Sequence, residues 1–336
     1  MKAVDFLFVT TLYLGVLVGA SAVQAADTDG DGVQDLQDSF PYDPLRSKGN
    51  NNVLWAHHAS QPVGFVATFG YSVSDAGDVN ADGYDDVIVG THSRGVGNTL
   101  PGWAQVLSGL DGSVIHTFLG TSYRHKFGAA VSGAGDVNAD GFADVIVGAP
   151  LANFVNVYSG QNGQLLYQFV GNNNFFGESV SKAGDVNGDG FADILVGAPG
   201  DTVASAGAAY VYSGQNGSQL LMVQKENQGD FFGYAVSGGS DVNGDGVPDF
   251  VVGAYKYGGY SNDRTGAARV FSGVDGTQLH KFVGDIFGDE FGYSVAMAGD
   301  VDNDGKTDIV VGAPRNDLRD SDAGLIRIFS GNTGAV

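Results

Sequence analysis

Five copies of one pattern follow one another along the chain, and this repetition limits the fold more than any other feature. Each copy begins with Phe-Gly, continues through an Asp-rich stretch and ends in a short apolar run. The copies start 49 to 59 residues apart, at Phe69, Phe127, Phe176, Phe232 and Phe291. A Ser-Gly-x-x-Gly motif recurs in each copy, at positions 108, 159, 213, 272 and 330. Such a period is typical of a fold with one supersecondary unit per copy.

Each copy contains four segments that are typical of short β-strands. Examples are residues 145–147 after an Asp-rich stretch, residues 208–212 further along a copy, and residues 164–170 after a Ser-Gly-x-x-Gly motif. These segments are β-branched and aromatic, Gly, Asp and Asn bound them, and no helical period is sustained. We therefore predict an all-β fold, a β-propeller of four-stranded antiparallel blades with five repeats visible.

The Asp-rich stretch has the composition of a calcium-binding loop. In the second copy, side-chain oxygens fall at positions 1, 3, 5 and 9, and position 7 can offer its backbone carbonyl. Gly141, at position 6, permits a sharp turn. Oxygen ligands favour Ca²⁺ over zinc or copper, and Mg²⁺ is disfavoured because it keeps its waters. A set of Asx turns without metal is the alternative.

We predict about one Ca²⁺ for each loop. The ligand sets are Asp78, Asn80, Asp82, Tyr84 and Asp86; Asp136, Asn138, Asp140, Phe142 and Asp144; Asp185, Asn187, Asp189, Phe191 and Asp193; Asp241, Asn243, Asp245, Val247 and Asp249; and Asp300, Asp302, Asp304, Lys306 and Asp308. An EF-hand would place a bidentate Glu at position 12. Position 12 is Val in every copy here, so we expect the ninth-position Asp to close the site within a strand–strand connection.

The combination of Phe-Gly, the Asp loop and Gly-Ala-Pro resembles FG-GAP repeats, which occur in the β-propeller of integrin α chains and in related bacterial surface proteins. The resemblance covers about residues 69–334, and it implies a propeller with calcium-binding loops that serves adhesion. Two copies depart from the Gly-Ala-Pro ending, with Thr91-His92 in the first and Ala254-Tyr255 in the fourth. Integrin propellers have seven blades, whereas five repeats are visible in this chain.

We predict three segments along the chain: a signal peptide over 1–25, an acidic stalk over 26–50 and the propeller over 51–336. The first has a basic start, an apolar stretch and small residues before its end, although an uncleaved anchor is the alternative. The second resembles a thrombospondin type 3 repeat and is predicted to hold one more Ca²⁺, the alternative being a solvated acidic linker. Its candidate ligands are Asp27, Asp29, Asp31, Asp35 and Asp38.

Composition excludes several classes of function. The net charge of −22 argues against a nucleic-acid partner, which needs a basic surface. The chain has no Cys, so neither disulfides nor zinc thiolate sites contribute. Beyond the N-terminal segment, no stretch is long and apolar enough for a membrane span. We expect a secreted, periplasmic or cell-surface protein.

Antiparallel order predicts two different faces for each blade. The Asp loop and the Ser-Gly-x-x-Gly turn fall on one face, and the variable connections fall on the other. Loops on a rigid scaffold are where binding residues concentrate. We therefore expect the variable face to bind a protein or glycan ligand. Its candidate residues are Arg94, Trp103, Tyr123, Arg124, Tyr257, Tyr260, Arg264, Arg315 and Arg319.

The alternative functions are a propeller-type polysaccharide lyase or hydrolase with its site on the same variable face, and a purely structural surface-layer component. The six His residues share no repeat position, and no nucleophile elbow or His-Glu-x-x-His motif is present. We therefore assign no catalytic residue and predict that the protein is not an enzyme. The last copy stops before its fourth strand, and we predict that part of 51–67 supplies this strand and closes the ring.

Overall fold

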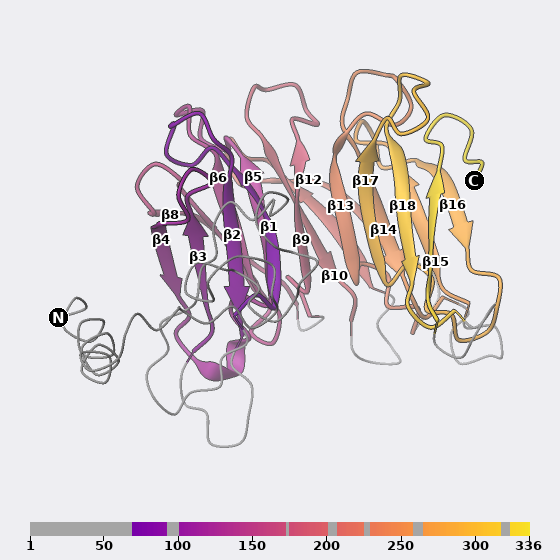
Figure 1. Cartoon of the computed structure of the whole chain (residues 1–336), viewed down its shortest axis with the longest axis horizontal. Coiled ribbons are helices and arrows are strands. Elements are labelled where there is room, and N and C mark those ends of the chain that lie inside the picture. Colours follow the sequence, from indigo (N-terminus) through magenta and orange to yellow (C-terminus); the bar gives the residue numbers. More distant parts are fainter. Residues whose placement is uncertain are drawn as a thin grey trace, which may run out of the picture. The chain divides into compact units, whose positions relative to one another are not determined.

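The computed structural model describes residues 69–92, 101–172, 175–200, 207–224, 229–257, 265–316 and 323–336. Within these residues the chain is all-β, with 19 strands and one 3₁₀ turn (η1, Tyr123–His125) (Figure 1). The predicted signal peptide and stalk lie outside the described residues, as does the segment predicted to close the ring.

The strands form five antiparallel sheets in chain order. The first sheet holds β1 (Ser72–Gly77), β2 (Asp86–Thr91), β3 (Trp103–Leu107) and β4 (Val114–Leu119). The second holds β5 (Ala130–Gly135), β6 (Asp144–Ala149), β7 (Phe154–Tyr158) and β8 (Leu165–Val170). The third holds β9 (Ser179–Gly184), β10 (Asp193–Ala198), β11 (Ala208–Tyr212) and β12 (Gln219–Gln224). The fourth holds β13 (Ala235–Ser240), β14 (Asp249–Ala254), β15 (Ala267–Phe271) and β16 (Gln278–Val283). The fifth holds β17 (Ser294–Gly299), β18 (Asp308–Ala313) and β19 (Leu325–Phe329).

Every sheet is a meander in which each strand pairs with the next strand along the chain. The second strand is the most buried, and all six residues of β6, β10 and β14 are buried. A continuous apolar run is what a strand covered on both faces requires. The fourth strand lies at the edge of its sheet and is largely exposed, as in β8. The prediction of four-stranded antiparallel units is confirmed for the first four repeats.

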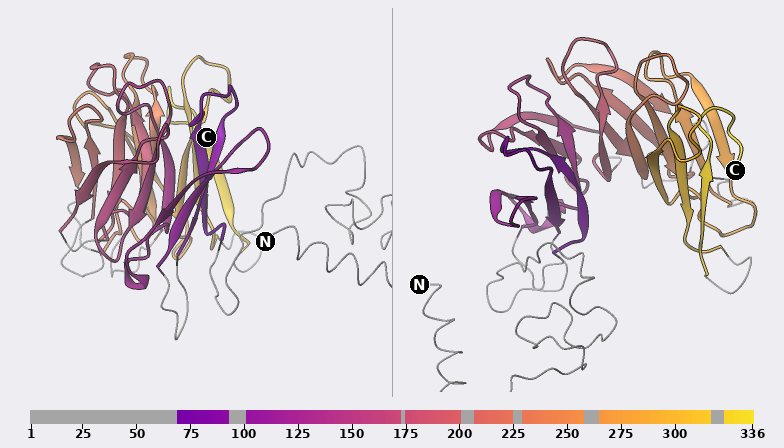
Figure 2. Two further views of the ribbon diagram at one scale, coloured as in Figure 1. Left: turned by 90° about the vertical axis from the view of Figure 1, so that its left-hand side faces the viewer. Right: turned by 45° about the horizontal axis from the view of Figure 1, so that its top comes forward.

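Successive sheets pack face to face, and the core lies between them. Ile146 and Val157 of the second sheet share a cluster with Val180 and Ile194 of the third. The first strand of each sheet lies beside the first strand of the next, as β5 lies beside β9. Figure 2 shows the sheets following one another in chain order. This is the arrangement of propeller blades, although the described sheets do not close into a ring.

The Phe-Gly and Gly-Ala-Pro motifs owe their glycines to close contact between neighbouring sheets. A Cβ on Gly148 would lie 2.3 Å from the carbonyl oxygen of Gly177 in the next sheet. The same clash recurs at Gly197 with Gly233 and at Gly253 with Gly292. Gly177 also has a φ of +89°, which disfavours other residues. The two motifs therefore interlock one blade with the next.

Among the described residues, the fifth sheet has three strands, as the sequence predicts. β19 forms its outer edge, with Ile326 at 71% exposure. Phe329 of β19 still stacks on Phe282 of the preceding sheet, with ring centroids 3.9 Å apart. The fourth and fifth sheets are therefore packed together. The outer edge of the fifth sheet, formed by β19, pairs with no described strand.

Candidate calcium loops and a tyrosine pocket on the opposite face

The five Asp loops share one conformation, in which their own side chains bond their own backbone. In the second loop, Asp136 accepts hydrogen bonds from the backbone N–H groups of Asp140 and Gly141, at 3.1 and 2.9 Å. Asn138 accepts from the N–H of Asp140, and Asp140 accepts from the N–H of Phe142. The chain thus curls around the side chains at positions 1, 3 and 5, as the predicted ligand spacing requires.

Two positions of the loop have left-handed backbone. Gly141 at position 6 has a φ of +87°, and Ala139 at position 4 has a φ of +56°. Position 4 is Gly188 and Gly244 in the third and fourth loops, which remove the strain that Ala139 carries. The curl is therefore set by the backbone as well as by the carboxylates.

The ninth-position Asp differs from the other loop carboxylates because it is buried. Asp144 begins β6, and its two carboxylate oxygens accept from the N–H groups of Val137 and Gly160, each at 2.9 Å. Gly160 belongs to the Ser-Gly-x-x-Gly turn. Bonds to this turn recur in the other four sheets, formed by Asp86, Asp193, Asp249 and Asp308 with Gly109, Gly214, Gly273 and Gly331. The Asp loop and the glycine turn therefore share one face, as predicted.

Burial changes the acidity of these ninth-position carboxyls. Desolvation raises the pKa of Asp144 to about 7 and that of Asp193 to about 6, because removal from water disfavours the charged form. Backbone hydrogen bonds oppose the shift, and the neighbouring loop carboxylates add to it. The pKa values of Asp86 and Asp249 are raised for the same principal reason.

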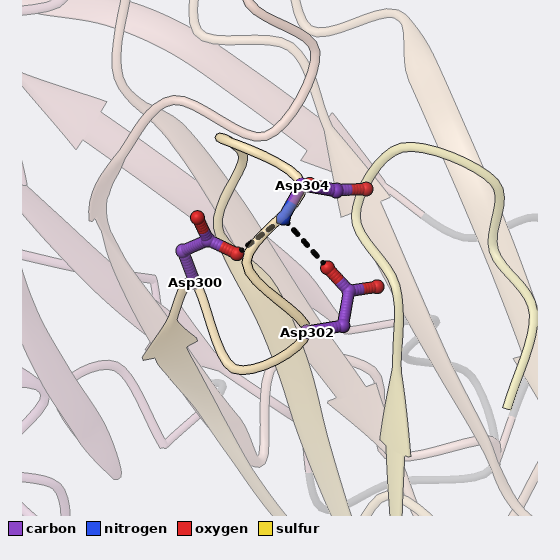
Figure 3. A group of neighbouring side chains, drawn as sticks. All are labelled: Asp300, Asp302 and Asp304. Atoms are coloured by element: carbon purple, nitrogen blue, oxygen red, sulfur yellow. Dashed lines mark hydrogen bonds between the residues drawn. The ribbon is translucent and has the colours of Figure 1, made fainter.

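The fifth loop has carboxylates at positions 1, 3 and 5, and they lie close enough together to share one cation. In the fifth loop, oxygens of Asp300, Asp302 and Asp304 lie within 4.8 Å of one another (Figure 3). Among the described residues, no ion pair joins a loop carboxylate to a Lys or Arg; the described pairs lie elsewhere, such as that between Lys182 and Asp75. This set of hard oxygen donors fits Ca²⁺.

The other predicted ligands among the described residues are those at position 7 of each loop. Each of them donates its backbone N–H to the fifth-position Asp; they are Tyr84, Phe142, Phe191, Val247 and Lys306. The side chain of Lys306 also reaches the fourth loop, where its ammonium donates to the carbonyl of Asn243 at 2.8 Å. Asp27, Asp29, Asp31, Asp35 and Asp38 lie outside the described residues.

Neighbouring loops are joined across sheets by backbone hydrogen bonds. The N–H of Ala143 donates to the carbonyl of Asp78 in the preceding loop, and the N–H of Ala192 donates to that of Asp136. The fourth loop has Pro248 at this position, which has no N–H to donate. Pro248 instead packs on Gly184, where an added Cβ would meet the proline ring at 2.7 Å. Contact between the third and fourth loops is therefore apolar at this position.

The opposite face of the fourth and fifth sheets carries a pocket that the sequence analysis missed in part. Tyr234 and Tyr293 directly precede the first strands of these sheets, and Tyr255 follows β14. They line a cavity of about 650 Å³ together with Arg315. Only Arg315 was among the predicted variable-face residues. A signal in the sequence could have found Tyr255, which stands where three other copies have Pro, whereas Tyr234 and Tyr293 occupy a position that is also Tyr in the first copy.

Several predicted variable-face residues are not brought to this pocket. Tyr123 and Arg124 lie in η1, beside the second sheet, where the Arg124 Nε donates to the Tyr123 hydroxyl at 2.8 Å. Trp103 stacks on Phe69, and Tyr257 accepts a hydrogen bond from Lys281. The remaining four lie outside the described residues: Arg94, Tyr260, Arg264 and Arg319.

Repeated four-stranded units with an Asp loop and interlocking glycines define the class of protein, and comparison with known families supports it. Residues 127–166, 176–212, 232–271 and 291–336 match the FG-GAP repeat. These matches support the assignment of the repeats to the FG-GAP family. The copy that starts at Phe69 lies outside the matched residues, although it forms a sheet of the same topology.

The relatives that the chain resembles are integrin α subunits. It is 35% identical to integrin alpha-5 of Xenopus laevis over 214 residues, which is 56% of this chain and 20% of that protein. It is 31% identical to integrin alpha pat-2 of Caenorhabditis elegans over 270 residues, 69% of this chain and 17% of that protein. The chain therefore spans a fifth or less of these relatives.

A solved structure, that of the V. cholerae biofilm matrix protein Bap1, aligns at 21% identity with a TM-score of 0.43, covering 79% of this chain and 38% of that one. Among the described residues, none forms a helix with the length and apolar character that a membrane crossing needs.

Proposed function

We propose that the chain is a calcium-stabilised recognition module that acts outside the cytoplasm, in adhesion to a protein or glycan ligand. The observation that carries this proposal is the contrast between the two faces. One face repeats the same oxygen-rich loop five times, and the other differs from sheet to sheet. The similarity to integrin α subunits, which are adhesion receptors, supports a recognition role.

In this proposal, Ca²⁺ belongs to the scaffold. The residues that would hold it are the carboxylates and amides at positions 1, 3 and 5, with the ninth-position Asp at the base of each loop. The cation would offset the repulsion between carboxylates that lie a few ångströms apart, and thereby stabilise the first strand–strand connection of each blade. The protein residues shape the loop, because they already hold its backbone through hydrogen bonds.

The proposal also includes ring closure by residues from 51–67 and secretion directed by 1–25. Closure would remove the exposed edge of β19, and a sheet edge left open invites pairing with other chains. Secretion accords with the Asp-rich loops, because extracellular fluids are rich in calcium.

The experiment that tests the proposed function measures adhesion of the full chain to extracellular proteins and to an array of glycans. We expect binding in calcium-containing buffer that is lost in EDTA and restored when Ca²⁺ is added back. Each polysaccharide of the array is also incubated with the protein and analysed for shortened products. Absence of adhesion in every condition, or turnover of a polysaccharide, would overturn the proposed function.

A further inference from the structure

The tyrosine pocket between the fourth and fifth sheets is separate from the Asp loops. It is lined by Tyr234, Tyr255, Tyr293, Lys256, Glu290 and Arg315, and its volume of about 650 Å³ lies within the usual range for small-molecule sites. The tyrosines lie where first strands begin and where β14 ends, whereas the Asp loops lie where first strands end and second strands begin. The pocket therefore opens on the face opposite to the loops.

One departure from the repeat contributes to this pocket. Tyr255 stands where Pro150, Pro199 and Pro314 stand in three other copies. Tyr234 and Tyr293 directly follow Phe-Gly, a position that is also Tyr in the first copy and is Ala129 and Glu178 in the second and third. The fourth and fifth sheets are therefore the neighbouring pair in which both copies have Tyr at this position and Tyr255 lies beside them. The Pro of the other copies shows that the scaffold does not need an aromatic residue at position 255.

The three tyrosine rings form the walls of the pocket. The ring of Tyr255 lies 4.5 Å from that of Tyr234 and 5.5 Å from that of Tyr293, with interplanar angles of 55° and 74°. The Tyr234 hydroxyl donates to the Tyr293 hydroxyl at 3.2 Å. Tyr293 is 40% exposed, and Tyr234 and Tyr255 are half-buried, so part of the aromatic surface is open to a guest. An apolar ring face beside a hydroxyl suits a ligand with both C–H and O–H groups.

The charged residues of the pocket already have partners within the protein. The Lys256 ammonium lies 4.2 Å from the centroid of Phe231 and 5.2 Å from that of Tyr255. Arg315 pairs with Glu290 at 3.2 Å. A cationic guest would meet two cations at this site, and a polyanion would meet a protein of net charge −22. A neutral ligand with many hydroxyls avoids both penalties and can hydrogen-bond to the pocket's charged groups.

We propose that this pocket binds a neutral saccharide unit of a glycan, with Tyr255 and Tyr293 stacking on the sugar ring and Glu290 and Arg315 hydrogen-bonding its hydroxyls. The inference rests on the proposed recognition function and names its ligand class. It also explains why the fourth copy loses its Pro. A proline at position 255 would keep the scaffold and remove the aromatic wall.

The test uses the full chain in calcium-containing buffer and four neutral disaccharides: maltose, cellobiose, lactose and mannobiose. Saturation-transfer NMR detects binding, and titration gives the dissociation constant. We expect at least one disaccharide to bind, and Y255P and Y293A each to weaken its binding about fivefold or more. The matched control is Y71A, which changes the same repeat position in the first sheet, where Tyr71 contacts His92. Circular dichroism confirms that each variant folds.

Two further probes identify a different occupant. If tetralysine or a galacturonate oligomer binds and no neutral disaccharide does, the saccharide assignment is wrong. It is also wrong if both pocket variants bind the disaccharide as tightly as the unchanged protein. If no disaccharide binds and the Y255P and Y293A variants adhere as well as the unchanged protein, this inference is wrong but the proposed adhesion function is not affected. Disaccharide binding without any adhesion would support the pocket and overturn the adhesive role.

Discussion

Asp144 accepts a 2.9 Å hydrogen bond from the backbone N–H of Gly160, which ties the Asp loop of the second sheet to the glycine turn 16 residues further along. The glycine is required there because a Cβ on Gly160 would lie 1.8 Å from the carbonyl oxygen of Ala143. The same pairing in all five sheets gives the Ser-Gly-x-x-Gly motif a physical reason. It holds the loop end of each blade together.

Asp144→Ala should therefore destabilise the protein with or without calcium. The substitution leaves the buried N–H groups of Val137 and Gly160 without their acceptor, at a cost on the order of 3 kcal/mol in the free energy of unfolding. Urea denaturation in EDTA measures the loss. Asp140→Ala is the matched control, because its carboxylate is more exposed, and we expect it to cost about 1 kcal/mol or less in EDTA. Equal costs for the two variants would contradict the distinction between them.

Calcium removal should lower the melting temperature sharply. A cation present at 100 times its dissociation constant stabilises the folded state by about 2.7 kcal/mol per site. Differential scanning calorimetry with added Ca²⁺ and with EDTA measures the shift, and isothermal titration calorimetry measures the number of ions bound. Asp140→Ala should remove one ion from that number. Identical melting in EDTA and in Ca²⁺ would exclude a structural role for the metal.

Ala139→Gly should stabilise the second loop, and Gly141→Ala should destabilise it. Both positions have positive φ, where a Cβ costs about 1–2 kcal/mol and glycine is free of that cost. An added Cβ at Gly141 meets nothing within 4 Å, so any loss there arises from backbone strain alone. We expect changes of about 1 kcal/mol in opposite directions, measured by thermal melting in calcium. Changes of the same sign would contradict the strain that we assign to position 4.

Tyr234 and Tyr255 of the pocket should ionise late in an alkaline titration. Desolvation, followed by the charge of Glu290, raises the pKa of Tyr255 to about 12, and desolvation with the Tyr293 hydrogen bond raises that of Tyr234 further. Because the folded-state pKa exceeds the unfolded value near 10, this contribution to stability is present below pH 10 and is lost as pH rises toward 12. Absorbance at 295 nm follows ionisation. Y255P should remove one late phenol; an unchanged late phase would show that Tyr255 ionises normally.

Deletion of residues 1–66 should abolish cooperative unfolding. If a strand from 51–67 completes the fifth blade, its loss leaves the outer edge of β19 unpaired and the ring open. Urea denaturation monitored by circular dichroism and by tryptophan fluorescence would then give transitions that do not coincide. Deletion of residues 1–50, which keeps the predicted strand, is the control. If the protein that lacks residues 1–66 unfolds in a single transition, unchanged from that of the full chain, closure of the ring by this segment is contradicted.

Local chemistry in the repeated sequence was enough to predict the strands and the loop face. The apolar run after each Asp loop is rich in β-branched residues and is bounded by Asp and Gly, so it predicts a short strand. The positions of Asp136, Asn138 and Asp140 predict the curl of the loop, because alternate residues turn toward one centre. Both predictions depend only on residues that lie close together in the sequence.

The features that depend on contacts between sheets were decided by the tertiary structure. Nothing within a copy relates Gly148 to Gly177, and only the packing of one sheet on the next shows that both must lack a Cβ. Likewise, the ninth-position Asp was predicted as a ligand, and the fold adds that its oxygens hold the turn at Gly160. The pocket is the clearest case. Tyr234, Tyr255 and Tyr293 are up to 59 residues apart in the sequence, and they meet because their strands begin and end at one face of two packed sheets.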